Sequence, residues 1–149
     1  MPIKISLHKE CIDRLSERIK GIRDALTDAQ QAANQETKSS AGDKHETGRA
    51  MMQLETEKLH AQLEQALIDQ DKLNRIDPES VTTKTGEGSL LLTDHLNLYF
   101  SISTGKIEVD GVEYVTLSIN SPLGMAARGC QAGDSFTFRG QQYTISSIY

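Results

Sequence analysis

Two apolar stripes with alternating spacings of three and four residues, separated by a short polar segment, most constrain this chain. The first stripe, within residues 8–35, consists of Ile12, Leu15, Ile19, Ile22, Leu26, Ala29 and Ala33. The second, within residues 43–75, consists of Met52, Thr56, Leu59, Leu63, Ala66, Gln70 and Leu73. This alternation is the signature of a coiled-coil seam. Two such helices of similar length, joined by a short turn, must pack antiparallel. The sequence therefore predicts an N-terminal helical hairpin.

The reversal between the helices is expected at residues 36–42, which contain two serines, an alanine and a glycine. Small and polar residues of this kind suit a turn. The first seven residues carry no clear pattern and are expected to be weakly extended. The second helix should end at Asp77-Pro78, because proline disfavours helical geometry in the residue before it.

A change in composition after Pro78 predicts a second domain. From Val81 onward, β-branched and aromatic residues alternate with turn residues, and Asp110-Gly111 is a strong signal for a tight hairpin. Strands are expected at residues 89–93, 96–103, 106–109, 112–119, 134–138 and 142–148, with one short helix at residues 122–128. The predicted class is α+β, with an antiparallel coiled-coil hairpin over residues 1–77, its acidic tip near 36–46, and a small antiparallel β domain over residues 78–149.

Charge and cysteine usage narrow the function. The 149 residues carry a formal net charge of -5, which argues against direct DNA binding, since phosphate neutralisation needs a basic surface. Cys11 and Cys130 form no CxxC pair, and the four histidines lack metal-ligand spacing, so no disulfide framework or zinc site is predicted. No apolar run has the length of a signal peptide or membrane span, so a cytoplasmic protein is expected.

The predicted tip carries Asp43 and Glu46, three positions apart. On a helix such residues lie on one face, with Cβ atoms about 5–6 Å apart. They have two interpretations. One is a capping pair, in which Asp43 caps the helix and Glu46 reaches back to the cap amide. The other is a pair of oxygen ligands that address one magnesium ion together, completed by a partner.

The tip sequence AGDKHET, and INSPLGMAARG followed by AGD in the second domain, resemble stretches of the bacterial transcription elongation factors of the GreA/GreB family, which promote transcript cleavage. The tip AGDKHET resembles the family's GD-x-x-E sequence at the start of the second coiled-coil helix. INSPLGMAARG followed by AGD resembles the turn, short helix and G-D step of the family's C-terminal domain. The resemblance covers nearly the whole chain, and it implies an FKBP-like fold for the second domain.

The resemblance also implies a function and a partner. Such a factor binds the secondary channel of bacterial RNA polymerase as a monomer and stimulates the polymerase's own cleavage of backtracked RNA. It is not an enzyme by itself. Asp43 and Glu46 would help hold a Mg²⁺ ion shared with the polymerase active site, and Asn120, Ser121 and Pro122 would contact the channel rim. DNA would be met only through the polymerase, and no membrane is involved.

Positive charges near the tip are candidates for contact with the nascent RNA 3′ end. They are Lys38, Lys44 and Arg49, and their alternative is an ordinary solvated helix surface. Ser121-Pro122 likewise has a purely structural interpretation, as a helix N-cap followed by proline in the first turn.

Departures from the family pattern keep two other functions open. After Glu46 the family usually continues with another acidic residue and a tyrosine, whereas this chain has Thr47-Gly48-Arg49-Ala50. It could therefore be a channel-binding regulator of the polymerase that does not promote cleavage. The implied FKBP-like fold raises a third possibility, a prolyl isomerase with an aromatic-lined pocket. The aromatic residues of the second domain are Tyr99, Phe100, Tyr114, Phe136, Phe138, Tyr143 and Tyr149.

Overall fold

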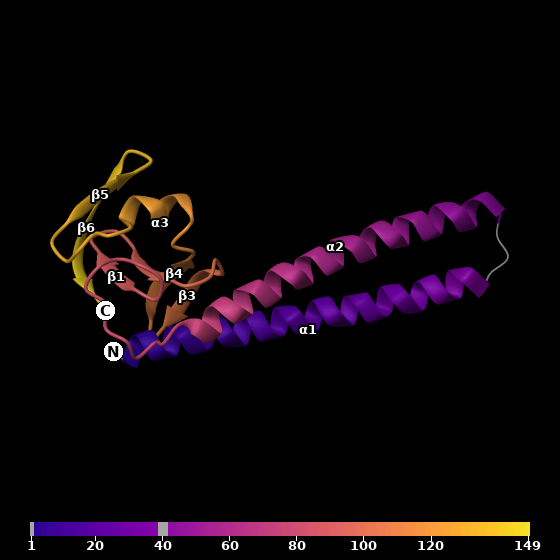
Figure 1. Ribbon diagram of the computed structural model, residues 1–149, viewed down its shortest axis with the longest axis horizontal. Helices are drawn as coiled ribbons and strands as arrows, with labels where there is room; N and C mark the ends of the chain where they lie inside the picture. The colour runs from indigo at the N-terminus through magenta and orange to yellow at the C-terminus, as the bar shows by residue number, and fades with distance from the viewer. Residues whose placement is uncertain (1, 39–41) are drawn as a thin grey trace. The chain divides into compact units, whose positions relative to one another are not determined.

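The computed structural model describes residues 2–38 and 42–149, and the side chains of residues 36–46 lie outside that description. Two long helices precede a set of short strands and one short helix (Figure 1). In chain order these are α1 (Pro2–Lys38), α2 (Gly42–Arg75), β1 (Leu90–Thr93), β2 (Asn97–Phe100), β3 (Gly105–Val109), β4 (Val112–Leu117), α3 (Pro122–Ala127), β5 (Ser135–Phe138) and β6 (Gln141–Ile148). The predicted α+β class is confirmed.

Helix α1 begins earlier than predicted. It starts at Pro2, so the expectation of an extended segment over the first seven residues is wrong. Proline is well suited to a first helical position, where its missing N–H is not needed. In the first turns of the helix, Leu7 and Cys11 are completely buried. This packing stabilises the helix there, although the segment is too short to show a helical period in the sequence.

The beginning of the predicted seam also needs correction. Ile12 is 37% exposed, whereas its neighbour Cys11 is 0% exposed. The buried stripe therefore enters through Leu7, Cys11 and Leu15 at spacings of four. From Leu15 onward the stripe follows the predicted alternation.

Residues Leu15–Gln70 form one compact unit, the helical hairpin. Over these residues α1 and α2 run side by side in opposite directions (Figure 1). Its fully buried seam residues are Leu15, Ile19, Ile22, Leu59 and Ala66. Nearer the turn, the seam residues Leu26, Ala29, Ala33, Met52 and Thr56 are only half-buried. Burial therefore declines along the hairpin from its base toward its tip.

The other compact unit combines Met1–Arg14 with Asp71–Tyr149. Its strands follow the order β3-β4-β2-β1-β6-β5. Neighbouring strands are antiparallel except β2 and β4, which pair in parallel, with Leu98 opposite Val115. The prediction of a purely antiparallel sheet missed this pair, because the connection after β2 passes to the edge strand β3 before the chain returns as β4 beside β2.

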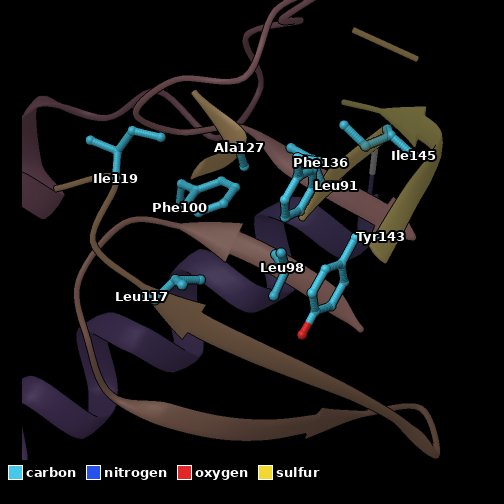
Figure 2. Close-up of a cluster of buried hydrophobic side chains, with 9 residues drawn as sticks. All are labelled: Leu91, Leu98, Phe100, Leu117, Ile119, Ala127, Phe136, Tyr143 and Ile145. Atoms are coloured by element: carbon cyan, nitrogen blue, oxygen red, sulfur yellow. The ribbon is translucent and has the colours of Figure 1, made fainter. Parts of the chain in front are cut away.

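The core of this unit is a cluster of apolar side chains from the strands and α3 (Figure 2). Its members are Leu91, Leu98, Phe100, Leu117, Ile119, Ala127, Phe136, Tyr143 and Ile145. The rings of Phe136 and Tyr143 stack with centroids 5.1 Å apart. Strands β5 and β6 and helix α3 are thereby joined to the central strands.

A row of polar side chains attaches the first turns of α1 to the strands. Lys4 donates to the Ser80 carbonyl at 2.9 Å, and His8 Nδ1 lies 2.8 Å from the Tyr99 hydroxyl. Burial lowers the pKa of Lys4 and of His8 and raises that of Tyr99. Because these contacts tie residues 1–14 to the strands, the two compact units differ from the expected division into 1–77 and 78–149.

Within residues 2–38 and 42–149, no helix is both long and apolar enough to span a membrane.

Candidate functional site

The predicted acidic tip falls at the start of α2. The helix begins at Gly42, so Asp43 and Glu46 belong to its first turns, three positions apart. This backbone placement puts the two positions on one helix face. The side chains of Asp43, Glu46, Lys38 and Lys44 lie outside the described residues. Their predicted roles in metal and RNA binding therefore stay predictions.

Arg49 is the one predicted RNA-contact residue with a described side chain. It is exposed, and it borders a shallow groove between the two helices together with Asn34, Met52 and Gln53. Among the described side chains, no ion pair involves Arg49. Its guanidinium group therefore faces solvent at the side of the hairpin nearest the tip, where an anionic ligand could reach it.

The segment Asn120-Ser121-Pro122 forms a well-braced turn at the start of α3. Ser121 is the N-cap: its hydroxyl accepts from the Gly124 N–H at 3.1 Å and donates to the Ser118 carbonyl at 2.6 Å. Pro122 occupies the first helical position and is exposed. The structural interpretation, an N-cap followed by proline, is therefore correct, and it leaves Pro122 on the surface for a contact.

Asn120 is exposed and held by its neighbours. Its Oδ1 accepts from Arg128 Nη2 at 2.8 Å, and its N–H donates to the Ser118 hydroxyl at 3.1 Å. Because these hydrogen bonds already fix the side chain, less conformational entropy would be lost when a partner binds. The predicted rim-contact surface is thus rigid and accessible, and its role in binding stays a prediction.

Gly124 keeps this turn in place. A Cβ atom at this position would lie 2.5 Å from the Ile119 carbonyl oxygen and 2.6 Å from that of Ser118. Real Cβ atoms do not come so close to backbone oxygen, so only glycine lets α3 approach the end of β4 this closely. The sequence showed this glycine within INSPLGM, but only the structure explains why it is needed.

The two predicted sites belong to different compact units. The tip residues and Arg49 lie in the hairpin, whereas residues 120–122 lie in the unit that contains the strands. The sequence missed a further cluster, the buried row of Lys4, His8 and Tyr99. Its only signal was a helical spacing of four between two polar residues, in a segment expected to be extended.

Among the described side chains, no three His, Cys, Asp or Glu residues gather closely enough to hold a metal ion. Two carboxylates at the tip offer hard oxygen donors, which is the ligand chemistry of Mg²⁺, but too few of them for a complete coordination shell. The donor set is therefore compatible with an ion that a partner also holds.

Five of the second domain's seven aromatic side chains lie in the interior. They are Tyr99, Phe100, Tyr114, Phe136 and Tyr143. Phe138 and Tyr149 are half-buried. Most of the aromatic surface thus serves the core, and little is left to line an exposed pocket of the kind that a prolyl isomerase needs.

Comparison with known proteins gives similarity to solved structures only. No family model matches the chain, and no curated protein matches it. The crystal structure of GreA factor homolog 1 (Gfh1) from Thermus thermophilus superposes with a TM-score of 0.37 at 19% identity, covering 93% of this chain and 94% of that one. Thermus aquaticus Gfh1 gives a TM-score of 0.35 at 17% identity, with 92% of each chain covered. Superpositions at this level establish neither a family nor an activity.

Proposed function

We propose that this protein is a Gre-type transcription elongation factor that binds the secondary channel of bacterial RNA polymerase and stimulates the polymerase's cleavage of backtracked RNA. The observation that carries the proposal is the start of α2 at Gly42, which is the first residue of the GD-x-x-E sequence. An acidic pair on the first turns of one long hairpin helix is the arrangement that the family resemblance requires.

The dimensions of the hairpin suit this role. Helix α2 has 34 residues, which corresponds to about 51 Å at 1.5 Å per residue. A slender pair of helices of such length can carry the tip carboxylates deep into a channel that a globular domain could not enter. The second unit supplies the braced Asn120–Pro122 turn, which would remain outside and contact the rim.

Asp43 and Glu46 would hold a Mg²⁺ ion together with the polymerase. When bound, such an ion stabilises the charge that develops during phosphodiester hydrolysis and lowers the pKa of its water. The carboxylates supply two oxygen ligands on one helix face, and Arg49 and the two tip lysines offer positive charge to the RNA backbone. The factor is not an enzyme alone, because two carboxylates leave most of the coordination shell to the polymerase.

RNA cleavage in a stalled elongation complex tests the proposal directly. The cognate polymerase and Mg²⁺ are combined with wild-type protein or with the double variant Asp43→Ala/Glu46→Ala. We expect cleavage with the wild type and at least a hundredfold loss with the variant, while both bind the polymerase equally. Equal cleavage by the two proteins would show that the carboxylates only cap the helix.

A second function is favoured by the sequence that follows the acidic pair. Thr47-Gly48-Arg49-Ala50 replaces the acidic residue and tyrosine that the family usually carries there. A factor of this kind would occupy the channel and regulate the polymerase without promoting cleavage. Binding of both proteins with cleavage by neither would establish this regulator. Turnover of a proline-containing model peptide would instead support the prolyl isomerase.

A further inference from the structure

The side of α2 that faces away from the seam carries a second apolar stripe. Met51 and Leu54 are each 66% exposed and Ile68 is 52% exposed, and Ala61 is exposed between them. Their spacings of three, seven and seven residues place all four on one helix face. None of them belongs to the seam that α2 shares with α1.

A single exposed apolar side chain on a protein surface needs no explanation. Here, however, the stripe is continuous in register. Lys58 and Gln65 fill the two gaps in the stripe. With them, the positions from Leu54 to Ile68 are spaced four, three, four and three residues apart. The aliphatic stem of Lys58 can extend the apolar surface while its ammonium group stays in water. The face therefore has the pattern of a helix that contacts another protein surface.

Acidic residues flank the stripe on both sides. Glu57 and Glu64 follow one edge, and Glu55 and Asp69 follow the other. Gln53 donates to Glu57 at 3.4 Å and Gln65 donates to Asp69 at 3.2 Å. These amide contacts leave the carboxylate charges uncompensated, and within the described side chains no ion pair involves any of the four.

This charge pattern selects against a second copy of the chain. In a parallel pair of α2 stripes, Glu64 would face Asp69 of the other copy, and in an antiparallel pair Glu57 would face Glu64. Like charges opposite one another are destabilising in coiled-coil pairing. The complementary surface is one with an apolar centre and a basic rim.

We propose that the outer stripe of α2, formed by Met51, Leu54, Ala61 and Ile68, is a docking surface for an apolar protein surface rimmed by lysine or arginine, and that this surface is the wall of the polymerase channel. The identity of the partner rests on the proposed function above. Within a channel, the hairpin must present its outer face to protein. The stripe would fix the rotation of the hairpin about its long axis, and hence the direction in which the tip carboxylates point.

Binding of the full chain to cognate core polymerase tests this proposal. Fluorescently labelled wild type is compared with Leu54→Gln/Ile68→Gln, which replaces the two branched apolar side chains of the stripe. We expect the Kd of the double variant to rise at least tenfold. Leu67→Gln is the matched control. Leu67 lies on the same helix and is 38% exposed, but it is rotated by about 100° from Ile68 around the helix axis and so lies off the stripe. It should bind like the wild type, and circular dichroism at 222 nm checks that all variants fold.

Charge variants test the basic rim separately. Glu57→Lys/Glu64→Lys should weaken binding several-fold at low salt, and this effect should shrink as salt rises. If the wild type and every stripe variant bound the polymerase equally well, the docking surface would be overturned and the proposed function would stand. Wild type that does not bind the polymerase would overturn both. If the free protein sedimented as a dimer and Leu54→Gln/Ile68→Gln sedimented as a monomer, the stripe would be a self-association surface instead.

Discussion

The unit that contains the strands and the helical hairpin are stabilised in different ways. In the first, many side chains are completely buried, and among them Leu91, Leu98 and Phe100 are each 0% exposed. In the hairpin, a single seam provides the packing, and its buried residues are Leu15, Ile19, Ile22, Leu59 and Ala66. Nearer the turn than Ile22 and Leu59, the seam residues are only half-buried.

The two candidate sites therefore differ in how tightly the structure around them is packed. The Asn120–Pro122 turn rests on a glycine contact and a compact core. The first turns of α2, which carry Asp43 and Glu46, lie beyond the half-buried seam residues Met52 and Thr56. Seam packing therefore supports that end of the hairpin less than it supports the base. The two regions can be followed separately, because all four tyrosines lie in the unit with the strands and most helical residues lie in the hairpin.

The largest effect should follow removal of a core ring. Phe100→Ala should lower the free energy of unfolding by about 3–5 kcal/mol, because it deletes a fully buried aromatic side chain and leaves a cavity. Urea unfolding followed by tyrosine fluorescence measures the loss. Leu26→Ala, in the half-buried part of the hairpin seam, is the control and should change that transition much less. An equal loss for both would mean that the two units unfold as one.

Gly124→Ala should have the next largest effect, because the new methyl group would meet backbone oxygens at 2.5 and 2.6 Å. Overpacking of this kind costs about 1–3 kcal/mol, and relief requires residues 118–121 to move. We therefore expect lower stability and, under the proposed function, weaker polymerase binding. Gly129→Ala has open space around its Cβ but a φ of +79°, so it tests backbone strain without the clash. A Gly124→Ala variant as stable as the wild type would contradict the predicted clash.

The hairpin and most strands could be predicted because local pattern determines them. Heptad spacing specified the α2 seam, and Asp110-Gly111, both with positive φ, marked the β3–β4 turn. The first turns of α1 could not be predicted, because their helix is stabilised by contacts with residues more than 70 positions away, such as Lys4 with Ser80. The parallel pairing of β2 with β4 is likewise a long-range choice that no local period encodes.

The candidate sites were only partly predictable for the same reason. The positions of Asp43 and Glu46 followed from a motif and a helix start. The rigidity of Asn120 depends on Arg128, and the closeness of α3 depends on Gly124, and neither is visible without the packed turn. His8 was not selected at all, because its partner Tyr99 lies 91 positions away.

The pH dependence of stability should reflect the polar attachment of α1. Burial lowers the pKa of His8 in the folded state, although the Leu73 carbonyl and Asp77 partly favour its charged form, and Lys4 opposes it. Below about pH 6.5 the unfolded chain binds a proton that the folded chain does not, so stability falls with decreasing pH, by at most about 1.4 kcal/mol per pH unit. His8→Gln should flatten this fall between pH 6.5 and 5 in tyrosine-monitored unfolding. An unchanged slope would show that His8 already titrates normally in the fold.

The smallest predicted change should be a gain, and it concerns the hairpin alone. Gly21 lies inside α1 with nothing within 4 Å of an added Cβ, next to the buried seam residue Ile22. Alanine there should stabilise the helix by about 1 kcal/mol, because glycine loses more backbone entropy on folding. The transition at 222 nm should shift upward, while the tyrosine transition should stay where it is if the two units are energetically separate. If both transitions shifted upward, α1, which runs through both units, would couple their unfolding. The two units would then differ in packing but not in stability.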